Sequence, residues 1–220
     1  MKRLSVITFA ALLLAGCSTS LHVRKTSNPY VKPLFYARYL SPASPLDQQI
    51  QATVDALRAN PRDAALHNAL GQLLAQKGFP KDAETEFERA VDADRHFYAG
   101  WFNLGILRSA RGDYVGARIA FNRTIRYKPG HSEALFQLAL LEEKRGNADD
   151  AIAYMAKAFS INRSLLDVRV NPQILDTKLM ALALLRAYPN EHNRQVLLFQ
   201  PTPAGYGQKA IPVVPAAPPH

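Results

Sequence analysis

The sequence predicts an all-α protein, built as a short α-solenoid of three helical repeats between capping helices. One observation is a period of 34 residues that runs without insertion from residue 64 to 165. Another is a glycine at the same place in each period, where a helix would end in a left-handed turn. The chain has a single cysteine, which excludes an intrachain disulfide and leaves the fold to its apolar core.

Each period carries the same types of residue at the same offsets. The equivalent positions are Leu70-Gly71, Leu104-Gly105 and Leu138-Ala139; Gly78, Gly112 and Gly146; Ala83, Ala117 and Ala151; Phe87, Phe121 and Met155; and Ala90, Thr124 and Ala158. This pattern resembles the tetratricopeptide repeat, a helix–turn–helix unit of the same length. The resemblance divides this part of the chain into repeats at 64–97, 98–131 and 132–165. The second repeat is the clearest, with Trp101, Tyr114 and Pro129 also in place.

The flanking segments predict helices that close the two ends of the array, because a repeat stack exposes apolar surface at its ends. Residues 44–63 form the N-terminal cap, where Ser44, Pro45 and Asp47 are an N-cap, an N1 proline and an early acid. Residues 166–190 form the C-terminal cap, with a helix from 172 to 187. The apolar side chains expected on its buried face are Ile174, Leu175, Leu179, Leu182 and Leu185.

The start of the chain has the layout of a secretory signal peptide over residues 1–16. Lys2 and Arg3 precede an apolar run that is shorter than the ~20 residues of a membrane-spanning helix. Leu14-Ala15-Gly16-Cys17 resembles the lipobox of bacterial lipoproteins, and that resemblance implies cleavage before Cys17 and acylation of its thiol. An ordinary secretory signal with a chance cysteine is the alternative. The residue after the cysteine is Ser18 rather than Asp, which in that family favours the outer membrane, facing the periplasm.

The charge of the chain is strongly basic, with a formal net charge of +9. Basic proteins bind nucleic acid or anionic surfaces, and an exported protein rarely meets nucleic acid. The expected counterparts are therefore anionic lipid, lipopolysaccharide or an acidic protein.

Two segments are expected to lie outside the folded domain. Residues 17–43 are predicted to be a basic and aromatic tether, for which two interpretations stay open: contact with a membrane interface, or packing of residues 35–40 along the first helices. Residues 191–220 are rich in proline and are predicted to be a disordered tail of extended chain.

No motif in the sequence predicts catalysis, a metal or a cofactor other than the acyl chains on Cys17. The six histidines are scattered, no zinc signature occurs, and no nucleophile, phosphate-loop or dinucleotide motif is present. Trp101 stands at a packing position of the repeat, which favours a core role over a binding anchor. The prediction is a non-enzymatic protein.

The concave groove of the array is the leading candidate for a binding site, because tetratricopeptide repeats line such a groove with the first helix of each unit. The family positions fall on Asn68, Gln72, Phe102, Asn103, Ile106, Phe136, Gln137 and Leu140. The resemblance implies that Asn103 bonds the backbone of a bound peptide. The basic clamp that some members use for acidic C-termini is missing, with Asn68 and Glu133 at two of its positions. The alternative is that Phe102 and Phe136 pack against the chain's own cap or tether.

A second candidate surface is a basic stripe on the convex side, made by Arg118, Arg123 and Arg126 at helical spacing. A merely solvated face is the alternative. These observations together predict a membrane-anchored adaptor or scaffold in the bacterial cell envelope, which binds a protein partner through its groove. The rival function is an envelope-binding module that contacts lipopolysaccharide, anionic lipid or peptidoglycan through the basic face.

Overall fold

The computed structural model describes residues 28–189, and over this range the chain is helical without a strand. The α-helices are α1 (Pro45–Ala59), α2 (Ala64–Lys77), α3 (Pro80–Ala93), α4 (Tyr98–Ala110), α5 (Tyr114–Tyr127), α6 (Ser132–Lys144), α7 (Ala148–Ile161) and α8 (Met180–Ala187). Short 3-10 helices are η1 (Pro29–Val31), η2 (Phe35–Tyr39), η3 (Arg163–Leu166) and η4 (Pro172–Asp176). The predicted all-α solenoid is confirmed. The expected signal peptide, Cys17 and the proline-rich tail lie outside the described residues.

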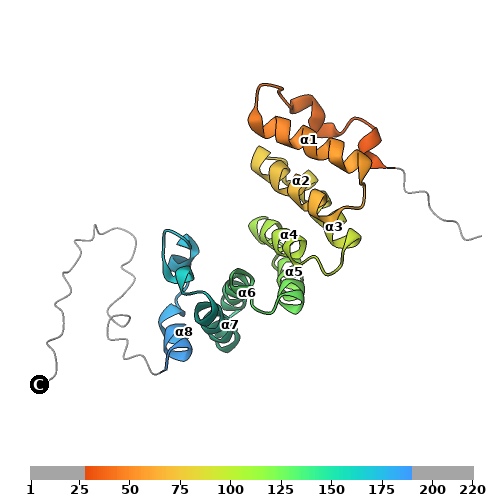
Figure 1. Ribbon diagram of the computed structural model, residues 1–220. Coiled ribbons are helices and arrows are strands. Elements are labelled where there is room, and N and C mark those ends of the chain that lie inside the picture. The colour runs from red at the N-terminus through yellow and green to blue at the C-terminus, as the bar shows by residue number, and fades with distance from the viewer. Residues whose placement is uncertain (1–27, 190–220) are drawn as a thin grey trace, which may run out of the picture.

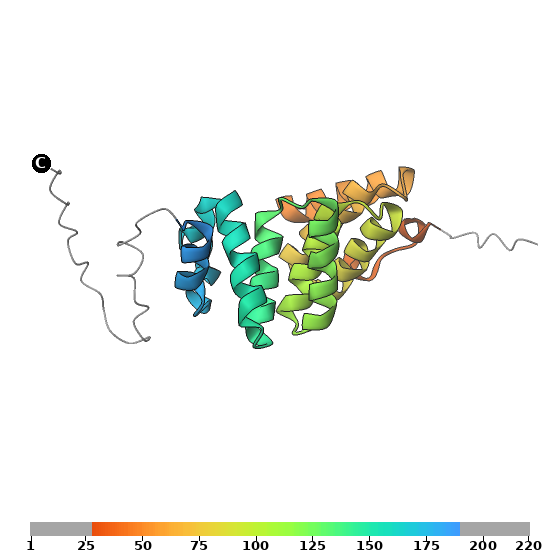
Figure 2. The ribbon, with the colours of Figure 1, turned by 90° about the horizontal axis from the view of Figure 1, so that it is seen from below.

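The helices form successive hairpins, α2 with α3, α4 with α5 and α6 with α7. The first helices of the hairpins, α2, α4 and α6, follow one side of the array, and α3, α5 and α7 follow the other (Figure 1). Turned by 90°, the hairpins stand in a row along an elongated body (Figure 2). The first helices therefore line one continuous surface, and the second helices line the opposite one.

Each hairpin is closed by contact between a small residue and a large one. A Cβ on Gly105 of α4 would lie 2.6 Å from the Phe121 ring of α5, and a Cβ on Gly71 would lie equally close to Phe87. In the third repeat the same positions hold Ala139 and a thinner partner, Met155. The small residue thus gives the aromatic ring room, as the period predicts.

The turn within each hairpin follows a glycine with a positive φ, as the sequence predicts. Gly78, Gly112 and Gly146 have φ of 93°, 87° and 80°, and in the described part of the chain no other type of residue has a positive φ. L-residues with a side chain rarely adopt this backbone conformation. The three glycines therefore fix the same turn in all three repeats.

Helix α1 begins as its sequence predicts and covers the first repeat. The Ser44 hydroxyl accepts a hydrogen bond from the Asp47 amide, and Pro45 occupies the first turn. The buried Asp47 carboxylate accepts from Lys77 Nζ at 2.8 Å and from the Ser41 amide at 2.9 Å. The hydrogen bond from Lys77 is the main reason that the pKa of Asp47 lies below its usual value.

Residues 28–43, which we call the N-terminal strap, pack on the repeats instead of forming a free tether. Tyr30 is completely buried and Tyr36 is 3% exposed, both within the core cluster that α1, α2 and α3 share. The rings of Tyr36 and Tyr39 lie 6.1 and 5.7 Å from the ring of Phe79. An unfolded tether is therefore wrong for this part, and the other interpretation, packing of residues 35–40 along the first helices, agrees with the structure. Burial of the tyrosines stabilises the packed strap by more than the loss of chain entropy costs.

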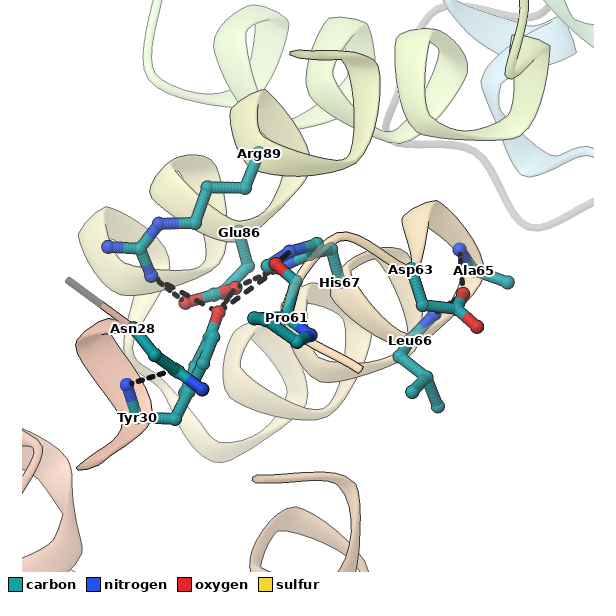
Figure 3. A network of polar contacts seen from close by, with 9 residues as sticks. All are labelled: Asn28, Tyr30, Pro61, Asp63, Ala65, Leu66, His67, Glu86 and Arg89. Carbon is teal, nitrogen blue, oxygen red and sulfur yellow. Dashed lines mark hydrogen bonds and ion pairs between the residues drawn. The ribbon is translucent and has the colours of Figure 1, made fainter. Parts of the chain in front are cut away.

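A polar network holds the buried end of the strap in place (Figure 3). The Tyr30 hydroxyl donates to Glu86 and lies 3.1 Å from His67 Nδ1, while Arg89 donates to the same hydroxyl at 3.2 Å. His67 Nδ1 is 2.9 Å from Glu86 Oε2, and its Nε2 is 3.1 Å from the Pro61 carbonyl oxygen. Burial and the bond to Glu86 raise the pKa of Tyr30, so the hydroxyl keeps the proton that it donates.

The C-terminal cap differs from the single helix expected over 172–187. It consists of η4 and α8, separated at residues 177–179, where the Glu143 carboxylate accepts hydrogen bonds from the chain. The Thr177 hydroxyl donates to Glu143 at 2.6 Å, and the Lys178 amide donates at 2.8 Å. A backbone amide bonded to a carboxylate cannot continue a helix ladder.

The break changes which side chains of the cap are buried. Ile174, Ala183 and Leu184 enter the core, whereas Leu175, Leu182 and Leu185 are about half exposed, contrary to expectation. The continuous helical periodicity assumed from the sequence is not kept across the break. We call residues 162–179 the C-terminal clasp.

Candidate partner-binding groove

An asparagine pair marks the centre of the surface lined by α2 and α4. Asn103 Nδ2 donates to Asn68 Oδ1 at 2.8 Å, which joins the first repeat to the second. Asn68 is buried, with 9% of its surface exposed, and Asn103 is half-buried. Within residues 28–189, Asn68 Nδ2 and Asn103 Oδ1 make no further hydrogen bond. The pair therefore offers Asn68 Nδ2 as a donor and Asn103 Oδ1 as an acceptor to a ligand, which matches the groups of a peptide backbone.

Apolar side chains flank this pair. Ile106 of α4 is 37% exposed, and Phe102, one turn earlier, is half-buried. Gln72 of α2 is exposed, and Leu140 of α6 is half-buried against the core cluster of the third repeat. This part of the groove combines a polar centre with an apolar margin, so it can hold both backbone and side chain of an extended segment.

At its α6 end, the surface that the first helices line is covered by the C-terminal clasp. Phe136 is 1% exposed and belongs to the core cluster that includes Phe159 and Ile174. Gln137 Nε2 donates to Gln173 Oε1 of the clasp at 2.5 Å. Phe136 and Gln137 are therefore not available as groove residues, because the chain's own cap packs there. In Figure 1 the clasp lies on the α6 side of the array.

The third repeat begins with an aromatic cluster that sequence reasoning missed. His131 caps α6 by accepting a hydrogen bond from the Ala134 amide, and its ring lies 4.6 Å from the Phe102 ring and 5.8 Å from the Tyr98 ring. Burial lowers the pKa of His131 below its usual value. His131 follows Phe97 by one period, and both precede a first helix, so the repeat register itself is the signal that could have identified the cap.

Trp101 lies at the edge of the core and not in the groove. Its side chain is half-buried against the cluster of the first repeat, and its indole Nε1 donates to the Arg95 carbonyl at 2.9 Å. The indole is thus held by the chain itself.

The predicted basic stripe lies on α5, the second helix of the middle repeat. Arg123 and Arg126 are exposed and Arg118 is half-buried, and none of the three forms an ion pair with another described residue. Val115 and Ile119 on the same helix are 68% and 52% exposed. This convex surface is therefore basic, with apolar side chains near the N-terminal end of α5.

Residues 28–189 hold neither a metal-ligand cluster nor a membrane-spanning helix. No group of three or more metal-ligating side chains lies close enough to hold an ion. No helix in this range combines the length and the apolar character that crossing a membrane requires.

The family model described as Tetratricopeptide repeat matches residues 51–96, 69–126 and 102–161, which together cover half of the chain. The chain therefore belongs to the tetratricopeptide repeat family, whose arrays serve as protein-interaction scaffolds.

Among solved structures, two described as crystal structures of MamA share this fold. One is 23% identical with a TM-score of 0.51, and covers 66% of this chain and 72% of its own. The other is 22% identical with a TM-score of 0.51, and covers 69% of this chain and 81% of its own. At this identity the likeness concerns the fold. No curated protein matches the sequence.

Proposed function

We propose that this protein is a bacterial lipoprotein that acts as an adaptor, holding a protein partner beside a membrane. The support for the anchor is Leu14-Ala15-Gly16-Cys17 after a basic and apolar start. One acyl chain gives only marginal attachment, whereas several hold a protein on a bilayer durably. Ser18 after the cysteine favours the outer membrane, with the folded domain in the periplasm.

The observation that carries the adaptor function is the Asn68–Asn103 pair with its free donor and acceptor. An extended segment of a partner can place a backbone carbonyl on Asn68 Nδ2 and a backbone amide on Asn103 Oδ1. An apolar side chain of the segment then rests on Ile106 and the open edge of Phe102. Since basic clamp residues are absent from this groove, we expect it to bind an internal stretch and not an acidic C-terminus.

Affinity isolation of the full chain from detergent-extracted membranes tests the groove. Ile106→Glu places a charge on the apolar margin, and we expect it to remove partners that the wild-type protein retains at high salt. Ile119→Glu is the matched control, because it makes the same change at an exposed isoleucine on the convex side. Equal partner lists for the two variants would contradict a groove-reading adaptor.

The anchor is tested separately by the intact mass of the protein extracted from membranes. We expect cleavage before Cys17 and a mass increase equal to its acyl groups. The Cys17→Ser variant should lose both and leave the membrane fraction. A wild-type protein that keeps residues 1–16 or carries an unmodified thiol would refute the lipoprotein proposal and leave the groove proposal standing.

A second candidate function is direct binding to an anionic envelope polymer or lipid through α5. The observation that favours it is the exposure of Arg123 and Arg126 without an ion pair in the described part of the chain. Such binding would weaken steeply with salt, because exposed charges are screened over about 8 Å at physiological ionic strength. Binding to lipopolysaccharide that persists in Arg123→Gln/Arg126→Gln would exclude this surface.

A further inference from the structure

The N-terminal strap has an outer face made of apolar and cationic side chains. Val31, Phe35 and Tyr39 are 73%, 56% and 51% exposed, and Lys32 and Arg38 are exposed beside them. We call these five residues the strap face. A soluble domain has no need to keep three large apolar side chains in water on a segment this short, so the face calls for an explanation.

Three members of the strap face, Phe35, Arg38 and Tyr39, lie against one another. The Phe35 and Tyr39 rings are 5.6 Å apart, and the guanidinium carbon of Arg38 lies 4.3 Å from the centre of the first ring and 5.4 Å from that of the second. A cation that lies over two neighbouring aromatic rings presents charge and apolar area at the same place.

The inner side of the strap holds this face in a fixed position. Tyr30 and Tyr36 are buried, and the Tyr30 hydroxyl joins the network with Glu86 and Arg89. The Tyr30 carbonyl accepts from Arg58 Nε of α1 at 2.8 Å, and the Asn28 side chain donates to the Arg58 carbonyl at 3.1 Å. Because Tyr30 is held by hydrogen bonds and both inner tyrosines are buried, the inner side of the strap fixes the position of the outer side chains.

The charge of the strap has one sign. Residues 28–43 contain cations and no acid, and the next acid along the chain, Asp47, is buried and paired with Lys77. Aromatic rings and cations on one surface suit the interface of a bilayer, where rings lie at headgroup depth and cations contact lipid phosphates. The complementary surface is therefore an anionic phospholipid headgroup layer.

We infer that the strap face seats on an anionic phospholipid bilayer and sets the orientation of the repeat array on the membrane. This inference rests on the proposed anchor at Cys17. Cys17 lies 11 residues before Asn28, and 11 residues of fully extended chain span at most about 40 Å. An anchor at that distance keeps the strap face close to the bilayer, so a weak surface contact is enough to hold it there. The C-terminal end of the array is then the end farther from the membrane.

The test couples the full chain to vesicles through Cys17, its only cysteine, with a maleimide lipid. This chemical link replaces the acyl chains, so the result does not depend on whether the cell acylates the protein. A Trp101→Phe background removes the native fluorophore, and Phe35→Trp places a new one on the strap face. Val170→Trp, at a 60% exposed valine of the clasp, is the matched control.

We expect brominated lipid to quench the tryptophan at position 35, and not the one at position 170, on vesicles of phosphatidylcholine with phosphatidylglycerol. Each of the changes Lys32→Gln and Arg38→Gln should weaken the contact about fivefold, as removal of one cation from an anionic surface does. Tyr39→Trp repeats the measurement on the same face if Phe35→Trp does not fold.

Absence of quenching at both strap positions, or equal quenching at positions 35 and 170, would overturn the inference. Quenching that is the same on vesicles without phosphatidylglycerol would also overturn it, because the cations would then contribute nothing. The intact mass of the protein from cells tests acylation of Cys17 independently. Failure of the anchor proposal and failure of the strap-face inference are therefore distinguishable.

Discussion

Replacement of Gly105 by alanine should destabilise the protein although alanine is the better helix former. The added Cβ would lie 2.6 Å from Cε1 and 2.7 Å from Cδ1 of Phe121, which is itself fully buried. Overpacking a core costs about 1–3 kcal/mol, and the gain in helix propensity offsets up to about 1 kcal/mol of this. We therefore expect Gly105→Ala to lower the free energy of unfolding by about 1–2 kcal/mol.

The third repeat supplies the compensating change. It holds Ala139 where the second holds Gly105, and Met155 where the second holds Phe121, and both residues are fully buried. Methionine is flexible and fills irregular space. In the double variant Gly105→Ala/Phe121→Met we expect the loss to be smaller than the sum of the two single losses by more than about 0.5 kcal/mol.

Urea denaturation followed by circular dichroism at 222 nm measures all four proteins of this cycle. Gly130→Ala is the control, because a Cβ at that position meets no atom within 4 Å, and its effect should stay within about 0.5 kcal/mol. Gly105→Ala as stable as the wild type, or strictly additive losses, would refute the proposed packing of glycine against the aromatic ring.

Tyr30→Phe keeps the buried ring but removes the donor to Glu86, so we expect a loss of about 1–3 kcal/mol in urea denaturation, whereas an unchanged midpoint would show that the network contributes nothing. Ile174→Ala should cost about 2–5 kcal/mol because Ile174 is 2% exposed, and Leu175→Ala, at a 58% exposed position, should change the same midpoint by less than about 0.5 kcal/mol; equal losses would contradict the clasp. Burial lowers the pKa of His131 in the folded protein, so the unfolded chain binds a proton at this histidine more tightly than the folded chain does. The free energy of unfolding is therefore highest above the pKa of an unfolded histidine, and it falls as the pH drops below that value. His131→Asn keeps an N-cap, and it should reduce the change in melting temperature between pH 7 and pH 5. A pH dependence of the melting temperature identical to that of the wild type would contradict the lowered pKa of His131.

The repeat architecture could be predicted from the sequence because it depends on local rules repeated three times. Gly78, Gly112 and Gly146 each satisfy a backbone requirement within their own turn, and Gly71 and Gly105 each face one aromatic ring a fixed distance along the chain. A period of 34 residues brings such pairs together in every unit. A departure from the pattern at one position therefore does not change the predicted repeat fold.

The two ends of the array depend on contacts that no local rule specifies. Tyr30 reaches Glu86 across 56 positions of sequence, and its burial turns a segment with no helical period into part of the core. Glu143 interrupts the C-terminal cap by accepting a hydrogen bond from the Lys178 amide, 35 positions further along the chain. The same clasp covers Phe136, which is why a residue at a groove position of the repeat is buried here.

Site-specific photo-crosslinking from Ile106 in the native cell shows whether a partner lies over α2 and α4. A probe at Ile119, on the convex face of the same repeat, is the control. We expect discrete protein adducts from position 106 that are absent from position 119 and that disappear in Asn103→Leu. No protein adduct at position 106, or adducts only at position 119, would contradict a partner-binding groove over α2 and α4.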